Sequence, residues 1–201
     1  MRKLSSLILA GLFFTGGTLA QVTVTNPANT TPALAATYTS LANAITALNT
    51  ITAISGPISI TLDPGNPQTA PAGGYVIQFI ATTTYANSIS ISGSGNTITA
   101  FTPQTTGLVN DAIFKLVGVD YMYLGNFIMR EHPANTNTVS GTNNMTEWGI
   151  ALLRASQTNG AKNNFIFNND IALNRGYRNT FGIYSNVMHV PATPYISQDI
   201  T

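Results

Sequence analysis

The feature that most constrains this chain is a succession of short segments in which apolar and polar residues alternate. Residues 58–62, 88–92 and 97–101 each follow a period of two. That period is typical of β-strands with one buried face. Clusters of Gly, Asn and Pro separate the segments, and these residues favour sharp turns. We therefore expect the chain to fold mainly into short strands.

A sequence pattern that occurs twice indicates how the strands are arranged. The segment Leu124–Ile128 resembles Phe167–Ile171, and each combines two corner residues with flanking apolar ones. Two coils of roughly 20 residues each would account for the separation of these two segments along the chain. Coils of that length are typical of solenoid repeats. The polar residues 133–145 are interpreted as a loop that bulges from one coil. We therefore predict an all-β fold, a right-handed parallel β-helix solenoid. Further strands are expected over residues 22–25, 75–81, 113–117, 121–129, 148–153, 164–167, 171–173 and 181–184.

One amphipathic helix is expected before the first coil. Thr31 would be its N-cap, and Pro32 would occupy the first helical position. A single apolar stripe follows at spacings of three and four residues, formed by Leu34, Tyr38, Leu41, Ile45 and Leu48. Because the end of a solenoid needs a cap, we predict that this helix closes it. Residues 21–57 would hold the first strand and the capping helix, and residues 58–201 the coils, truncated at the C-terminus.

The first twenty residues have the features of a secretory signal peptide. Arg2 and Lys3 precede an apolar stretch, and Thr18 and Ala20 are the small residues that a signal peptidase requires. We predict cleavage after Ala20, a secreted or cell-surface location, and no membrane span after cleavage. Cleavage changes the formal net charge from +1 to −1, which gives no basis for binding nucleic acid. The absence of Cys excludes disulfides and thiolate chemistry.

Several segments resemble a known class of proteins. Residues 38–49 and 55–62 are similar to the N-terminal part of large secreted proteins of Bacteroidetes-type bacteria, and residues 162–169 and 173–185 look like their coils. The resemblance covers most of residues 22–186 and rests on structural motifs. It implies a pectate-lyase-like right-handed parallel β-helix, of the kind often exported by type IX secretion.

Candidate catalytic residues come from the second half of the chain. All charged residues after the signal peptide except Asp63 follow Asn110. His132 and Glu147 are the catalytic candidates, with His132 as a base and Arg130 beside it as an anion clamp. The alternative is that residues 130–132 only form an ion pair at a turn. Enzymes of this fold use clustered acids, often with Ca²⁺, so a metal is expected only if the protein is an enzyme.

Candidate ligand-binding residues point to an extracellular polysaccharide or surface. Arg154, Arg175 and Arg178 would line a groove for acidic sugars or would be solvated loop residues. Arg130 is a further ligand-binding candidate. Trp148, beside the polar loop, is the aromatic residue expected to be exposed for sugar stacking. The carboxylates show no paired motif, so we expect a non-catalytic scaffold, adhesive or polysaccharide-binding, without cofactor or metal. The alternative is a polysaccharide lyase or glycoside hydrolase.

Overall fold

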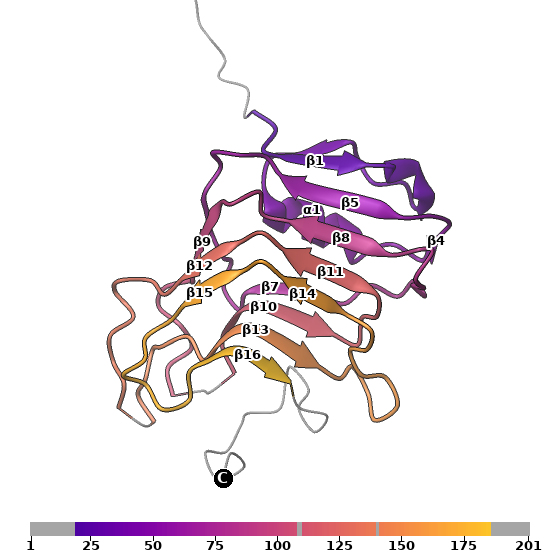
Figure 1. Ribbon diagram of the computed structural model, residues 1–201. Helices are drawn as coiled ribbons and strands as arrows, with labels where there is room; N and C mark the ends of the chain where they lie inside the picture. The colour runs from indigo at the N-terminus through magenta and orange to yellow at the C-terminus, as the bar shows by residue number, and fades with distance from the viewer. Residues whose placement is uncertain (1–18, 108–109, 140, 186–201) are drawn as a thin grey trace, which may run out of the picture.

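Successive coils of the chain stack into three parallel sheets (Figure 1). The computed structural model describes residues 19–107, 110–139 and 141–185. Sheet 1 contains β5 (Ile58–Leu62), β8 (Ile89–Ser92), β11 (Met122–Gly125) and β14 (Phe165–Phe167); sheet 2 contains β6 (Gln68–Thr69), β9 (Thr97–Thr99), β12 (Ile128–Arg130) and β15 (Asp170–Ala172); sheet 3 contains β7 (Tyr75–Ile77), β10 (Ala112–Val117), β13 (Trp148–Leu153) and β16 (Phe181–Ser185). The structure therefore confirms the predicted parallel β-helix, with about four turns.

The spacing between coils differs from the prediction. Tyr123 pairs with Phe165 and Ile128 with Asp170, an offset of 42 residues that spans one long coil. The predicted alignment, which placed Ile128 beside Ile171, was one residue out and divided the offset between two coils. In the structure Ile171 pairs with Met129, whose side chain is in the core. This coil is enlarged by the long connections between β12 and β13 and between β13 and β14, whereas Ile58 and Ile89 of the first two coils are only 31 residues apart.

The core consists of stacked apolar side chains from all three sheets. Ile60, Ile91 and Leu124 lie in register in sheet 1 and are fully buried. In sheet 3 the rings of Tyr75 and Phe114 stack at 5.0 Å between centroids. Burial of such side chains supplies most of the favourable free energy of a fold that lacks disulfides.

Sheet 3 differs from the other sheets because its outer face is also apolar. Val117 and Leu153 alternate with the core-facing residues Leu116 and Leu152, so they point outward. These outward residues form a second buried cluster, which consists of Ala112, Val117, Trp148, Ala151, Leu153 and Tyr184. The two central strands of sheet 3, β10 and β13, are therefore buried on both faces, as continuous apolar runs predict.

The N-terminal region extends sheet 1 with antiparallel strands. The strand β1 (Val22–Thr25) has the predicted bounds and pairs with both β5 and β3 (Thr37–Tyr38). A 3-10 helix, η1 (Pro27–Asn29), follows β1, and β2 (Thr30–Thr31) pairs with β4 (Ala53–Ile54). No helix of the described residues is long and apolar enough to cross a membrane. The predicted signal peptide lies almost entirely outside the described residues.

The helix α1 (Leu41–Leu48) is shorter than predicted. Its N-cap is Ser40, whose side chain accepts a hydrogen bond from the N–H of Asn43. The predicted N-cap Thr31 belongs to β2 instead, because residues 30–31 and 37–38 form antiparallel strand pairs. The apolar side of α1 is buried in the same core as the coils, and the Asn49 side chain bonds to the backbone of β7 and to Gln78. These contacts agree with a cap, but that role stays a prediction.

Candidate functional site

A buried carboxyl cluster, which consists of Asp111, Glu131 and Glu147, lies where the long loops enter sheet 3. Glu147 directly precedes β13 and is fully buried. Its Oε2 accepts a hydrogen bond from the Asp111 backbone N–H (2.9 Å), and its Oε1 accepts one from the Asn143 side chain (3.1 Å). The Glu147 N–H in turn donates to the Asp111 carbonyl (3.1 Å). These bonds extend the pairing of β10 and β13 into the preceding loops.

Glu131 organises the loop of residues 131–147 from its other end. Its two carboxylate oxygens accept hydrogen bonds from the backbone N–H (3.0 Å) and the hydroxyl (2.8 Å) of Thr146. The Asn135 side chain donates to the same carboxylate at 2.8 Å. Gln104, from the loop of the preceding coil, donates to the Thr146 hydroxyl at 2.9 Å. The loops of adjacent coils are thus joined through buried polar side chains.

Burial dominates the electrostatics of the carboxyl cluster. It raises the pKa of Glu147 to about 9, and the neighbouring Asp111 carboxylate adds to this effect. Burial also raises the pKa of Asp111 and lowers the pKa of Lys115, whose ammonium lies in the field of both carboxylates. The pKa of Tyr177, next to Glu147, is raised to about 12, mainly by burial. Glu147 is therefore expected to be protonated in the folded protein at neutral pH.

The carboxyl cluster has the composition of a catalytic site but not its accessibility. Asp111, Lys115 and Glu147 are 2%, 7% and 0% exposed, so solvent and substrate do not reach them. Glu131 is half-buried, and its carboxylate accepts hydrogen bonds from Asn135 and Thr146. No three His, Asp or Glu side chains among the described residues are placed to hold a metal ion. The arrangement fits a structural role, in which hydrogen-bonded carboxyls join the loops of adjacent coils.

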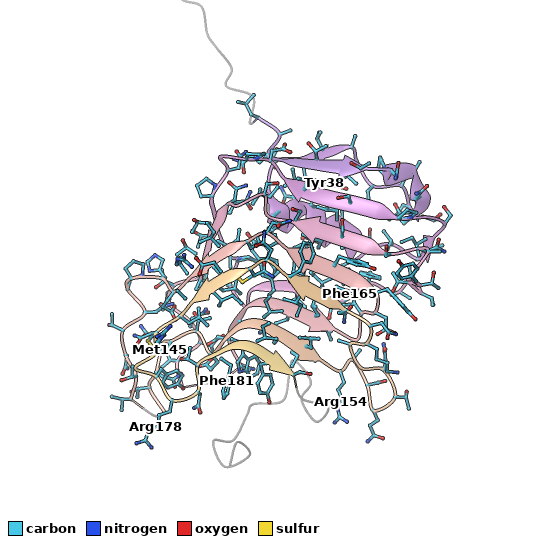
Figure 2. The ribbon with its side chains drawn as sticks, in the orientation of Figure 1. Tyr38, Met145, Arg154, Phe165, Arg178 and Phe181 are labelled. Carbon is cyan, nitrogen blue, oxygen red and sulfur yellow. The ribbon has the colours of Figure 1, made fainter. Side chains whose placement is uncertain are left out.

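The structure does not bring the predicted site residues together. Arg154 lies beyond the C-terminal end of β13, on the opposite side of the molecule from Arg178, as Figure 2 shows. Arg175 and Arg178 are exposed in the loop between β15 and β16. His132 lies in the loop after β12, and its Nδ1 accepts a hydrogen bond from the Ala134 N–H. Glu147 is fully buried, whereas Arg175 and Arg178 are exposed.

Trp148 is not available for sugar stacking. Its side chain is 3% exposed and stacks on Tyr184 of the next coil, with 4.3 Å between ring centroids and 5° between planes. The expectation that Trp148 is exposed was wrong because the outer face of sheet 3 is itself a buried apolar cluster.

A solvent-open groove runs across three coils at the corner between sheets 1 and 2. This corner groove has a volume of about 440 Å³ and is lined by Ser94, Gly95, Asn126, Phe127, Ile128, Asn168, Asn169 and Asp170. Asn126 and Asn168 turn the corner with positive φ angles of 62° and 49°, which Asn tolerates better than most residues. Their side chains form a ladder, in which Asn168 donates to Asn126 (2.7 Å) and Asn126 donates to Ser92 (3.1 Å).

An aromatic side chain lies beside the corner groove. The ring of Phe167 covers Gly125 of the preceding coil, because a Cβ atom at Gly125 would lie 2.6 Å from the Phe167 Cζ. Phe167 is 43% exposed, so its ring offers an apolar surface to solvent next to the corner amides. Phe165, two residues earlier, stacks instead on Tyr123, with 4.7 Å between centroids. Phe165 is itself 50% exposed, but Phe167 directly precedes Asn168, so its ring is the exposed one beside the groove.

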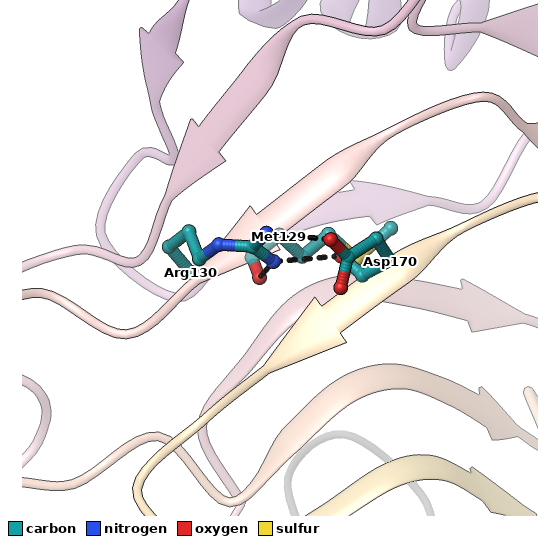
Figure 3. A network of polar contacts seen from close by, with 3 residues as sticks. All are labelled: Met129, Arg130 and Asp170. Atoms are coloured by element: carbon teal, nitrogen blue, oxygen red, sulfur yellow. Dashed lines mark hydrogen bonds and ion pairs between the residues drawn. The ribbon is translucent and has the colours of Figure 1, made fainter.

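The other side of the corner groove carries an ion pair between adjacent coils (Figure 3). Arg130 Nη2 lies 2.6 Å from the Asp170 Oδ2, and Arg130 Nη1 donates to the Met129 and Asp170 carbonyls. The hydrogen bond from Arg130 holds the pKa of Asp170 below its usual range. Because both side chains are well exposed, the pair adds little stability and remains accessible to a ligand.

Sequence reasoning missed most of these residues. Asp111 and Glu147 are 36 residues apart and meet only because β10 and β13 pair in register. The Asn-rich corners were recognised as turns, but their stacking into a groove depends on the register of adjacent coils. The fold and these two sites define a parallel β-helix protein with a buried carboxyl cluster and an open, amide-lined groove. No family model, curated protein or solved structure matches the chain, so the likeness to Bacteroidetes-type proteins stays a prediction.

Proposed function

We propose that the protein is an extracellular, non-catalytic β-helix that binds polysaccharide through the corner groove. The carrying observation is that the exposed Phe167 ring lies beside a row of carboxamides, from Asn126 and Asn168. Carboxamides donate to and accept from sugar hydroxyls, while an aromatic ring packs against the apolar face of a sugar. The groove crosses three coils and therefore suits an extended chain better than a small ligand.

The alternative, a polysaccharide lyase or hydrolase, has less support from the geometry. General acid–base catalysis requires carboxyl groups within hydrogen-bond reach of the substrate. Asp111 and Glu147 come together but are buried, and Asp170, which lines the groove, is paired with Arg130. We therefore assign the groove to binding, and the buried carboxyls to the fold.

A binding assay with neutral polysaccharides tests this proposal. We expect Phe167→Ala to weaken binding roughly tenfold, which corresponds to about 1.4 kcal/mol, within the range for loss of one stacking aromatic. Asn168→Ala should also weaken binding, by a smaller factor. Tyr85→Ala is the matched control, because Tyr85 is 76% exposed but lies in the loop between sheets 3 and 1, away from the groove. Equal affinities for the Phe167 variant and the control would refute the proposal.

The extracellular location has a separate test. Expression in a secreting bacterial host, followed by N-terminal sequencing of the exported protein, should find Gln21 as the first residue. A mature protein that retained residues 1–20 would contradict cleavage, whatever the outcome of the binding assay.

A further inference from the structure

A second pocket lies at the opposite edge of sheet 1 from the corner groove. The chain forms it between β13 and β14, where residues 154–162 loop out beside the C-terminal ends of β13 and β16. Its volume is about 290 Å³. The lining includes two cationic side chains, Arg154 and Lys162, two hydroxyls, Ser156 and Thr158, and the amide of Gln157. None of the described residues that line it is acidic, so these residues give the pocket a positive charge.

Arg154 has an unused donor inside the protein. Its Nε is buried and has no hydrogen-bond partner among the described residues, although a buried N–H normally has one. In Figure 2 the side chain of Arg154 points away from the ends of the strands. The Nε–H and one terminal N–H of a guanidinium form a fork that matches two oxygens of a carboxylate or sulfate. An oxyanion that enters the pocket would match this geometry.

The loop that carries these groups is held in place by its own hydrogen bonds. The Ser156 hydroxyl accepts from the N–H of Asn159 at 3.2 Å, and the Ala155 N–H donates to the Asn159 carbonyl at 2.8 Å. The neighbouring Asp120 does not occupy the pocket, because its carboxylate accepts the backbone N–H of Lys162 at 2.6 Å. The pocket is thus formed before any ligand enters, which lowers the entropic cost of binding.

We infer that this pocket, termed here the Arg154 pocket, binds the anionic substituent of a glycan, either a carboxylate or a sulfate ester. Arg154 holds the oxyanion through its fork, and Lys162 adds a second positive charge. The inference rests on the proposed polysaccharide binding and adds a substrate class, because the corner groove itself favours uncharged sugar hydroxyls. A glycan with anionic substituents would then contact the protein on both edges of sheet 1.

The first experiment titrates the full chain with sodium sulfate and with sodium glucuronate, against sodium chloride at equal ionic strength. The Arg154 Nε–H signal in a ¹H–¹⁵N NMR spectrum should shift with saturation, and the two salts report which oxyanion is preferred. Arg154→Gln should weaken the accompanying shifts of the Ser156 and Thr158 amides roughly tenfold or more, since a charge-assisted pair is lost. Arg178→Gln, an exposed arginine on the other side, should leave them unchanged. Absence of saturation, or an equal effect of both variants, would overturn the inference.

The second experiment compares glycans and separates this inference from the proposed function. Wild-type protein should bind a sulfated or carboxylated glucan more tightly than the neutral glucan, and Arg154→Gln should abolish the difference but keep the neutral binding. A difference that persists in Arg154→Gln, or is absent from the wild type, contradicts the inference. Failure of the neutral glucan to bind, with no effect of Phe167→Ala, contradicts the proposed function instead.

Discussion

The carboxyl cluster and the corner groove are built in the same way, but the polar residues of the first are buried and those of the second are exposed. Both arise where polar residues of successive coils stack beside the strands. At the entrance to sheet 3, long loops cover the stack, and Asp111 and Glu147 are buried. At the corner between sheets 1 and 2 the turns contain only a few residues, and Asn126, Asn168 and Asp170 remain open to solvent.

Loop length therefore determines whether a polar residue of this β-helix is buried or exposed. A buried carboxyl requires hydrogen-bond partners, and its burial shifts its pKa. Its contribution to stability therefore depends on pH. An uncovered amide or ion pair contributes little to stability and is available to a ligand. Substitutions in the carboxyl cluster should therefore alter unfolding, and those in the groove should alter binding.

The largest effect is expected when the Glu147 side chain is removed. Glu147→Ala leaves the buried N–H of Asp111 without its acceptor and opens a cavity among the loops. We expect the free energy of unfolding to fall by about 3 kcal/mol at pH 5, measured by urea denaturation. Asp170→Ala, which removes an exposed carboxylate, is the control and should have no comparable effect. Similar losses in both variants would remove the distinction between the two regions.

A smaller effect of opposite sign is expected from Glu147→Gln at alkaline pH. The pKa of Glu147 is about 9 when folded, against an ordinary value near 4.5, so between these values the unfolded state holds fewer protons. This contribution to stability is fully present below about pH 4.5 and is lost as the pH rises toward the folded pKa of Glu147. Gln cannot ionise, so the variant should be more stable than wild type at pH 8 and similar at pH 4.5.

The neighbours of Glu147 determine where this comparison is cleanest. The raised pKa of Asp111 gives a slope of the same sign, whereas the lowered pKa of Lys115 stabilises the fold as the pH rises through the alkaline range. The pKa of Tyr177 is about 12, so this residue titrates only at higher pH. Urea denaturation between pH 5 and 8 therefore isolates the carboxyls best, and an unchanged slope in Glu147→Gln would show that Glu147 is not their main contributor.

Gly125→Ala is expected to affect both stability and the groove, moderately. A Cβ at this position would lie 2.6 Å from the ring and from the carbonyl oxygen of Phe167, so the adjacent strand must shift. We expect a loss of about 1–3 kcal/mol on urea unfolding and weaker polysaccharide binding, because the Phe167 ring is displaced. Gly182→Ala is the matched control, since no atom lies within 4 Å of its Cβ position. If both variants behave alike, the close approach of Phe167 has no energetic role.

Local sequence patterns predicted where the strands lie better than they predicted which strands pair. The alternation of residues 58–62 correctly located β5, the strand predicted over residues 148–153 is β13, and residues 133–139 and 141–145 lie in a loop as predicted. The strand predicted over residues 121–129 is broken at Asn126, because this residue turns the corner with a positive φ. The helix began at Leu41 rather than Pro32, because strand pairing took the preceding residues.

The sites depended on long-range register, which the sequence did not reveal. A one-residue error in aligning Ile128 with Ile171 moves each side chain to the other face of the sheet. The same error hides the pairing of Arg130 with Asp170 and the placement of Phe167 over Gly125. The meeting of Asp111 with Glu147 depends in addition on loops whose lengths differ between coils.

The smallest effect is expected from the exposed ion pair. In Arg130→Gln the carboxylate of Asp170 loses its hydrogen bond and its nearby charge, so the pKa of Asp170 should rise toward its ordinary value near 4. A carboxyl with a lowered folded pKa stabilises the fold above its unfolded pKa and loses that contribution as the pH falls through the folded value. With both groups exposed, the change should be visible in an NMR titration of Asp170 but not in the urea midpoint at pH 7. A clear loss of stability would mean that the corner groove, like the carboxyl cluster, holds the coils together.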